Sequence, residues 1–357
     1  MKFNETILIE DLPAHLFLSL KNGSRISVKK FLHNDQLKIE DVNGIVNLKK
    51  KKYFIKVDFP IILNNLDYVR LYSLMLAEGS KTTEFRLHVP EIELHSLFKQ
   101  SIRNLFPNAK MEKLISTGES HGIPRSNAPS LLRFIIPIPN QIPNFIKTDK
   151  EFSKEFLKVF FESEGTVVNN RVKLTQSIPI ELEMFKFKTQ KRRIFLGELK
   201  RKRNLLKRIQ YFEPKILLDI QKMLEQHFGI NSKVRFESIR LNKTARKGKI
   251  TAKWVISITS KNITKFYNEI GFLTDNKKQK LEKISRVTKR NVDFFALKTM
   301  KKLSKYKKYF CFKEFIETMK KEGYVYPTVY LWRYQKNGMI TKIARGKYKV
   351  NSYLETN

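Results

Sequence analysis

Two short segments of the chain end in the same kind of sequence, a small residue followed by a glutamate and a glycine. Leu71–Gly79 reads LYSLMLAEG and Leu157–Gly165 reads LKVFFESEG, so Glu78 and Glu164 occupy equivalent positions. Each carboxylate falls in the last turn of a predicted helix, where it faces the negative end of the helix dipole and is disfavoured. A bound cation would remove that penalty, so the repeated glutamate favours a metal site.

The residues around the first glutamate indicate how the two segments could meet. Ser73 and Ala77, one turn apart, are small enough to let another helix backbone approach closely. If the two helices pack side by side, Glu78 and Glu164 converge at one end and repel each other unless metal lies between them. Mg²⁺ suits such all-oxygen sites, completed by water and phosphate. Two such metals can activate water and stabilise the leaving oxygen in phosphodiester cleavage. Either glutamate alone would be interpreted as an ordinary surface residue, and only the repetition favours metal chemistry.

The charge of the chain points to a polyanionic partner. The 357 residues contain 71 Lys and Arg against 34 Asp and Glu, a net charge of +37, while 41% are apolar, enough for packed cores. An excess that large repels itself in the folded state, so nucleic acid is the first candidate partner and a membrane surface the second. No apolar run reaches the ~18 residues of a spanning helix, and no signal-peptide pattern opens the chain. The single Cys311 excludes an internal disulfide framework and a multi-Cys zinc site, so we expect a cytoplasmic protein, of prokaryotic or archaeal origin.

The elements that would position the two glutamates repeat along the chain. In the first copy the patterns predict helices over 66–77, capped by Asn65, and 92–105, with strands over 83–89, 110–115 and 131–138. In the second copy they predict helices over 152–163, 214–228 and 263–270, with strands over 167–175, 234–241 and 251–259. Residues 66–288 therefore form a duplicated unit, with halves 66–146 and 147–288.

Three segments lie outside this repeat. Residues 1–65 predict a small β-rich or mixed module. A basic insertion over 182–213 contains Lys186–Arg208, in which Glu198 is the only acid. This stretch fits a solvated helical hairpin or a nucleic-acid surface about equally well.

The C-terminal stretch, 292–357, predicts helices over 294–303 and 312–321 and a third from Pro327 to about Asn337, then a hairpin of 340–343 with 348–350. This order resembles a winged helix-turn-helix, and the alternative is a small helical domain used for packing. The winged-helix interpretation places six side chains on its recognition helix and wing, namely Arg333, Gln335 and Lys336, and Lys342, Arg345 and Lys347.

The paired segments resemble the two motifs of single-chain LAGLIDADG (DOD-type) homing endonucleases. The resemblance extends over about residues 60–288. It includes the lead-in Ile142–Ile146 (IPNFI) before the second motif and the strand end Leu174–Ser177 (LTQS) after it. It also includes the last helix junction, Ile270-Gly271-Phe272, followed by Lys277 and Leu281.

The resemblance implies an α+β fold, αββαββα in each half, with two saddle-shaped antiparallel sheets over the major groove of DNA. It implies that Glu78 and Glu164 bind the metal and that Lys277, or alternatively Lys278, lies near the scissile phosphate. Gln176 would order active-site water. On the sheets we expect DNA contacts from Lys173, Arg235, Arg240 and Lys253.

The first half departs from the family pattern. No lysine lies between Leu131 and Phe145, where its basic residue would be expected, and Val89 stands where Gln176 stands in the second copy. Three outcomes are open: Arg133 or Lys147 substitutes, the enzyme nicks one strand, or cleavage has been lost.

The leading functional prediction is a site-specific, Mg²⁺-dependent endonuclease of double-stranded DNA, acting as a monomer and related to intron or intein mobile elements. One alternative is a DNA-binding regulator on a decayed scaffold. Another is an RNA-binding intron maturase, made less favourable because no stacked-aromatic motif is present. Protein splicing itself is not expected, because the splicing nucleophile and the His-Asn ending are missing.

Overall fold

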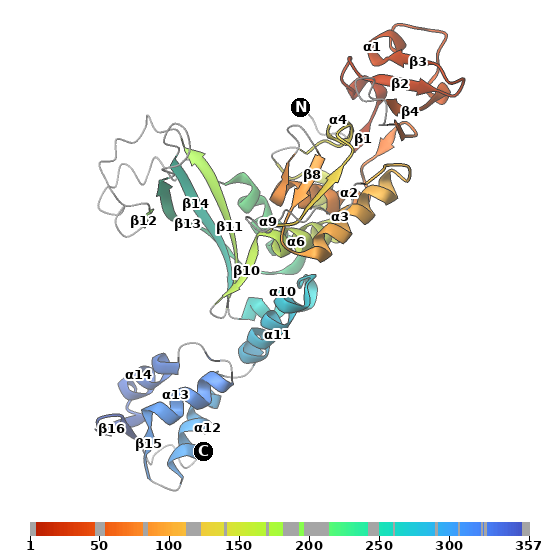
Figure 1. The fold of residues 1–357 in the computed structure, drawn as a ribbon. Helices are drawn as coiled ribbons and strands as arrows, with labels where there is room; N and C mark the ends of the chain where they lie inside the picture. Colours follow the sequence, from red (N-terminus) through yellow and green to blue (C-terminus); the bar gives the residue numbers. More distant parts are fainter. Residues whose placement is uncertain are drawn as a thin grey trace.

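The structure, a computed structural model, describes most of the chain, namely residues 5–46, 54–80, 85–111, 123–138, 141–168, 171–180, 193–195, 214–241, 250–259, 261–289, 292–305, 308–322, 324 and 327–351. Its fold is α+β with antiparallel sheets, which confirms the predicted class (Figure 1). None of the described helices combines the length and the apolarity needed to cross a bilayer.

The second half of the duplicated unit is built around a five-stranded antiparallel sheet of order β10-β11-β14-β13-β12. Its elements follow the predicted order, namely α6 (Lys150–Glu164), β10 (Gly165–Val168), β11 (Arg171–Ile180), β12 (Arg193–Phe195), α9 (Lys215–Phe228), β13 (Lys233–Leu241), β14 (Ile250–Thr259), α10 (Lys261–Glu269) and α11 (Asp275–Lys289). The strands β11 and β14 pair along their full length, from Arg171 opposite Thr259 to Ile180 opposite Ile250.

The first half carries a smaller sheet of order β7-β8-β9. Its elements are α2 (Leu66–Glu78), β7 (Gly79–Ser80), β8 (Phe85–His88), α3 (Ile92–Leu105), β9 (Arg125–Ala128), α4 (Leu132–Ile135) and α5 (Asn144–Thr148). The helix predicted over 92–105 is confirmed. Most of the strand predicted over 110–115 lies outside the described residues, and 110–111 are not in a strand.

The strand predicted over 131–138 is wrong, because this segment contains the short helix α4. Leu131, Leu132, Ile135 and Ile136 are all buried, and their spacing of one, four and five residues is that of one helix face. A short run of apolar residues does not distinguish helix from strand by periodicity. The third strand is instead β9, which pairs Leu87 with Ser126 and Phe85 with Ala128. Its polar sequence, RSNA, concealed it.

The helices α2 and α6 pack against each other at the centre of the duplicated unit (Figure 1). The predicted cap of α2 is confirmed, because Asn65 Oδ1 accepts from the Tyr68 amide. Asp149, for which no cap was predicted, caps α6 in the same way, with its Oδ1 accepting from the Phe152 amide. Ser73 is fully buried and its hydroxyl donates to the Phe156 carbonyl of α6, 3.0 Å away. The predicted close approach of the two helices at this small residue is therefore confirmed.

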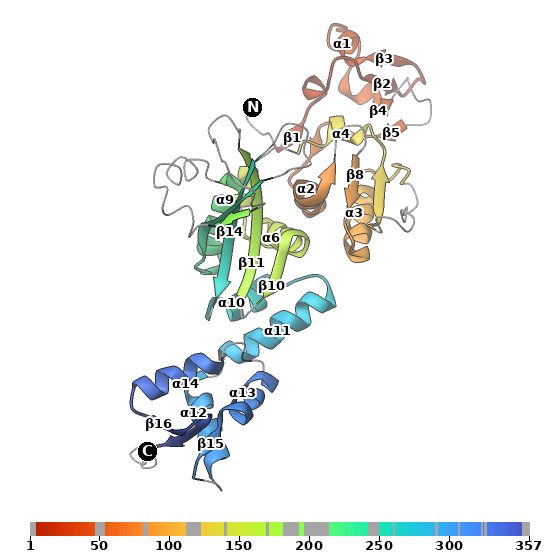
Figure 2. The same cartoon turned by 60° about the vertical axis from the view of Figure 1, so that its left-hand side comes forward.

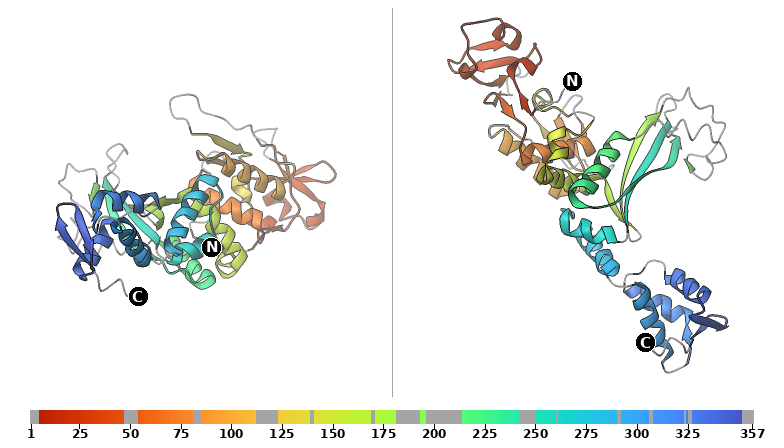
Figure 3. Two further views of the ribbon diagram at one scale, coloured as in Figure 1. Left: turned by 90° about the horizontal axis from the view of Figure 1, so that it is seen from below. Right: turned by 180° about the vertical axis from the view of Figure 1, so that it is seen from behind.

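The flanking segments form units at opposite ends of the molecule (Figure 3). The N-terminal one has a sheet of order β3-β2-β4-β5. Its elements are β1 (Thr6–Ile7), η1 (Ile9–Asp11), β2 (Phe17–Leu20), β3 (Arg25–Ser27), α1 (Val28–Phe31), η2 (Ile39–Asp41), β4 (Val42–Val46), β5 (Phe54–Lys56) and β6 (Ile61–Ile62). β1 pairs with β6, immediately before α2.

The C-terminal unit has its own apolar core, separate from that of the rest of the chain. It comprises α12 (Val292–Ser304), β15 (Phe310–Cys311), α13 (Phe312–Lys321), α14 (Pro327–Lys336), β16 (Ile340–Ala344) and β17 (Lys347–Val350). The three predicted helices and the hairpin are all present.

Most of the basic insertion 182–213 lies outside the described residues. Its described part is β12, which pairs with β13 at the edge of the larger sheet. The helical hairpin proposed as one interpretation of Lys186–Arg208 is therefore wrong for residues 193–195, where the chain extends the sheet.

Candidate active site and nucleic-acid interface

Glu78 and Glu164 are the last residues of α2 and α6, and the next residue in each copy begins a strand. Gly79 and Gly165 have extended backbones, and their amides donate to the Met75 and Phe161 carbonyls. A Cβ on Gly79 would lie 2.5 Å from Met75 Cα, and one on Gly165 would lie 2.3 Å from the Phe161 carbonyl oxygen. Both glycines are therefore required by close packing at the junction that aims the glutamates.

Both carboxyl groups have raised pKa values, and the charge of Glu78 acts on Glu164. Burial first, and then the charge of Glu78, raise the pKa of the Glu164 carboxyl to about 7, although Lys277 lowers it. Desolvation and the charge of Glu91 raise the pKa of Glu78, while His88 lowers it. The charge of Glu78 therefore reaches Glu164 where the helix pair ends and disfavours the ionised form of Glu164.

This arrangement suits a hard divalent cation. Among the described residues, no cluster of three or more His, Cys, Asp or Glu side chains is placed to hold a metal. A cation at the carboxylate pair would therefore complete its shell with water and phosphate oxygens, which Mg²⁺ prefers. Gln176 adds a polar atom nearby, because the pairing of Gly165 with Leu174 puts Gln176 opposite the end of α6. Its Oε1 is buried and has no hydrogen-bond partner in the described part of the chain.

Lys277 lies in the first turn of α11, and its ammonium reaches back to α6. The Nζ atom donates to the Glu162 carbonyl and lies 3.7 Å from the Glu162 carboxylate. Since Lys277 also lowers the pKa of Glu164, it is close to the carboxylate pair. Lys278, the alternative candidate, is exposed and pairs with Asp275 instead.

The first half holds apolar residues at the matching positions. Gly79 pairs with Leu87 as Gly165 pairs with Leu174, so Val89 takes the position of Gln176, and its side chain is buried. The candidate substitutes for the missing lysine are engaged elsewhere. Lys147 Nζ lies 3.6 Å from Asp219, and the Arg133 guanidinium lies over the Phe134 ring.

One face of the larger sheet is covered by helices and the other carries basic side chains. Val172, Leu174, Ile256 and Ile258 are buried on the covered face, with α6, α9 and α10 packed against the sheet. In Figure 2 the helices α6 and α9 lie behind the strands. Residues directly paired across strands share a face, and the opposite face holds Lys173 with Ser257, Ser177 with Lys253, and Arg235 with Val255.

Glu237 is an acid among these cations. It lies at the β13 bulge, with its carboxylate 2.8 Å from Lys253 Nζ and 3.6 Å from Lys173 Nζ. Hydrogen bonds and charge from the two lysines hold the pKa of Glu237 below its usual value, despite its partial burial. Lys173 and Lys253 are thus on the same face, as expected. Arg235 is exposed beside them, while the side chain of Arg240 lies outside the described part.

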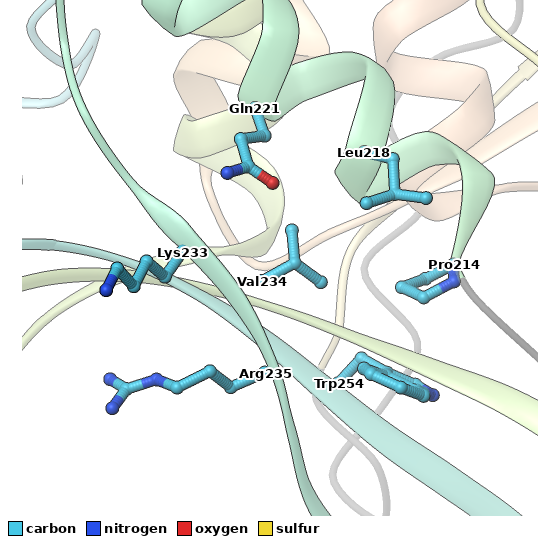
Figure 4. Close-up of a pocket in the computed structure, with 7 residues that line it drawn as sticks. All are labelled: Pro214, Leu218, Gln221, Lys233, Val234, Arg235 and Trp254. Atoms are coloured by element: carbon cyan, nitrogen blue, oxygen red, sulfur yellow. The ribbon is translucent and has the colours of Figure 1, made fainter. Parts of the chain in front are cut away.

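A hollow of about 220 Å³ lies between α9 and the larger sheet (Figure 4). The stems of Lys233 and Arg235 contribute to its wall, but both side chains extend away from Trp254. None of its lining residues is one of the carboxylates or Lys277, so it is separate from the candidate active site. The lining residues are Pro214, Leu218, Gln221, Lys233, Val234, Arg235 and Trp254.

The candidate DNA-binding residues of the C-terminal unit are exposed. Arg333 and Lys336 lie on the outer side of α14, and Arg345 lies at the turn between β16 and β17. Trp332 lies beside them with 64% of its surface exposed and Lys336 Nζ 5.2 Å from its ring centre.

The buried residues Glu162 and His95 were both missed by the sequence analysis. Glu162 is fully buried and is described below. Aligning the copies shows that Leu76 stands at its position in the first copy, but it does not show that Glu162 is buried or what it binds. His95 bridges the Val89 carbonyl and the Ser126 hydroxyl, at 2.9 Å each, and joins α3 to β9. No sequence signal identified its partner, because β9 itself was not predicted.

Comparison with known proteins finds a family match over part of the chain. Residues 151–271 match the family described as LAGLIDADG-like domain, and no curated protein matches the chain. This region contains the second glutamate motif and the larger sheet.

The chain has some similarity to solved structures that include two of DUF199/WhiA and one of I-DmoI. The N-terminal LAGLIDADG domain of DUF199/WhiA shares 15% identity, with 61% of this chain and 89% of that chain covered and a TM-score of 0.35. Full-length DUF199/WhiA from Thermatoga maritima shares 14% identity over 68% and 75%, with a TM-score of 0.36. I-DmoI in complex with DNA and Ca shares 13% identity over 62% and 98%, with a TM-score of 0.37.

Proposed function

Proceeding from the LAGLIDADG-like domain at residues 151–271, we propose that the chain is a site-specific endonuclease of double-stranded DNA that depends on Mg²⁺. The observation that carries the proposal is the position of Glu78 and Glu164 at the ends of the packed helices α2 and α6, where burial and the charge of Glu78 raise the pKa of Glu164. A polyanionic partner also fits the net charge of +37. Because one chain supplies both carboxylates, we expect it to act as a monomer.

In this proposal Glu78 and Glu164 hold the cation. The metal would supply positive charge to the leaving oxygen and make bound water more acidic. The Oε1 atom of Gln176 would accept a hydrogen bond from the attacking water. Lys277 would stabilise negative charge on the phosphate from its preorganised position in the first turn of α11.

The uncovered face of the larger sheet would bind the DNA major groove. Lys173, Lys253, Arg235 and Arg240 would neutralise phosphates or donate to base edges. The C-terminal unit has the chain order helix, strand, helix, helix, strand, strand, which supports a winged-helix interpretation. Arg333 and Lys336 on α14 and Arg345 on the hairpin would extend the contact with DNA.

A second candidate is a DNA-binding regulator in which cleavage has been lost. The observation that favours it is the first half, where Val89 replaces the glutamine and no lysine of the described residues is among the charges that shift the pKa of Glu78. Both glutamates argue against it, because carboxylates at helix ends in a basic protein serve no evident purpose without a cation.

An RNA-binding maturase would instead prefer structured RNA to duplex DNA in competition.

The function can be tested by incubating the full chain with a randomised library of supercoiled plasmids and Mg²⁺. We expect linear or nicked plasmids from which one long target sequence can be recovered. EDTA should abolish the products. Specific binding of duplex DNA with no cut product at any Mg²⁺ concentration would favour the regulator.

A further inference from the structure

Glu162 is a charged residue in the interior of the protein. It lies on α6 two residues before Glu164, and none of its surface is exposed. A buried carboxylate is strongly unfavourable unless hydrogen bonds and an opposite charge compensate it. The proposed function gives this residue no role.

The carboxylate of Glu162 binds the turn that leads into α11. Its Oε2 atom accepts from the backbone amides of Leu273 and Thr274, at 2.5 and 3.1 Å, and its Oε1 atom accepts from the Thr274 hydroxyl at 2.7 Å. These three bonds fix the start of α11 against α6.

The same residue also holds Lys277. The lysine ammonium donates to the Glu162 carbonyl and lies 3.7 Å from Oε1, while the ring centre of Phe272 lies 5.8 Å away. A lysine side chain has several rotatable bonds and loses considerable entropy when it is ordered. Because the Glu162 carbonyl and carboxylate both hold this ammonium, it stays beside the part of α6 that ends in Glu164.

The first half has no such arrangement. Leu76, two residues before Glu78, occupies the position of Glu162, and Val89 occupies that of Gln176. The acid, the lysine and the glutamine are thus present together in one half and missing together from the other. Loss of a cation would leave a buried acid uncompensated, so the acid and the lysine are expected to be kept or lost as a pair.

We propose that Glu162 is a positioning residue that holds Lys277 at the active site of the second half, so that this half cuts its DNA strand faster than the first half cuts the other. The proposal rests on the endonuclease function for its catalytic consequence. The contact between Glu162 and Lys277, called the clamp below, does not depend on that function.

The first test measures the clamp without DNA. The full chain is treated with an amine-acylating reagent, and the modification rates of Lys277 and Lys278 are followed by mass spectrometry. In the wild type Lys277 should react slowly, because its side chain is 18% exposed against 52% for Lys278. Glu162→Gln retains an acceptor for the two amides but removes the charge, so Lys277 should react several-fold faster while Lys278 is unchanged. An unchanged Lys277 rate would overturn the inference.

The second test follows the two strands of the recovered target separately, each labelled at its 5′ end, in single-turnover reactions. Glu162→Gln should slow one strand by about 10- to 100-fold, the range found for residues that orient catalytic groups, and leave duplex affinity unchanged. Lys277→Met should slow the same strand, and the double variant should be no slower than the worse single variant.

Thr274→Val is the matched control for a purely structural role. It removes the hydroxyl bond to Glu162 but leaves the lysine pair, so it should lower the melting temperature without changing the ratio of the strand rates. Equal slowing of both strands by Glu162→Gln would overturn the inference. If the wild type cuts neither strand, the endonuclease function fails and the acylation result alone decides whether the clamp exists.

Discussion

At the scale of single residues, the two carboxylates that would bind metal are costly to the protein without it. Glu164 carries a pKa of about 7, mainly because it is buried and then because Glu78 lies near it. Such perturbed groups are concentrated at functional sites. A surface glutamate near a helix end would have no comparable shift, so the environment of the pair favours a functional role.

The pKa of Glu164 predicts how metal affinity depends on pH. Below about pH 7 its carboxyl is protonated and must lose the proton to bind Mg²⁺. The affinity should therefore fall about tenfold per pH unit below 7 and level off above it. Calorimetric titration with Mg²⁺ from about pH 5 to pH 9 measures this profile. Glu164→Gln should remove the change of slope near pH 7. A wild-type affinity that does not change through pH 7 would contradict the role of Glu164 as a metal ligand.

At the scale of elements, the junctions between helix and strand aim the carboxylates. Gly79 and Gly165 each end a helix and begin a strand within one residue. Neither has room for a Cβ, although both have negative φ angles. The glycine of the motif is therefore a packing requirement and not a conformational one.

We predict that Gly165→Ala lowers stability by about 1–3 kcal/mol, the usual effect of overpacking. The added methyl group would meet the Phe161 carbonyl oxygen and move Glu164, so cleavage should fall as well. Thermal unfolding and plasmid cleavage measure the two effects, with Thr166→Ala on the next, exposed position as the control. A Gly165→Ala protein as stable as this control would show that the junction can relax.

The C-terminal unit offers an optical test of its proposed contact with DNA. The chain contains two tryptophans, of which Trp332 is 64% exposed and Trp254 only 6%. Duplex DNA should quench the fluorescence of the wild type, and Trp332→Phe should abolish most of the change. If the signal of Trp332→Phe changes as much as that of the wild type, α14 does not face DNA.

The elements with strong patterns could be predicted from sequence, and those without could not. α2, α6, β13 and β14 follow from apolar periodicity, caps and the repeat. β9 could not be recognised, because Ser126 and Asn127 are polar yet buried, and their burial depends on α3, distant in sequence. The glutamate pair was predictable because it repeats. Glu162 was not, because its partners at 273–277 follow it by more than a hundred residues.

At the scale of the whole molecule, the net charge of +37 is spread over units that would bind one long polyanion. The larger sheet and the C-terminal unit both present basic side chains, and α11 leads from one to the other (Figure 1). A long contact with DNA would release many counterions.

The affinity for duplex DNA should therefore decrease steeply with salt. Each phosphate contacted contributes about −0.9 to the slope of log affinity against log salt. Fluorescence anisotropy across salt concentrations should give a slope steeper than about −4. Replacing Arg333 and Lys336 with Gln should make it shallower by up to about 2. A nearly salt-independent affinity would contradict binding through phosphates.

The most direct test of the account is metal-dependent cleavage of a supercoiled plasmid carrying the recovered target, compared among wild type, Glu78→Gln, Glu164→Gln and the Lys278→Gln control. The account predicts cut product with Mg²⁺ from the wild type and the control. Both glutamate variants should lose more rate than the roughly 10- to 100-fold that replacing an outer-shell partner of a metal ligand costs, while they still bind duplex DNA. Cleavage at the wild-type rate by both glutamate variants would contradict the account, because the reaction would then take place elsewhere in the molecule.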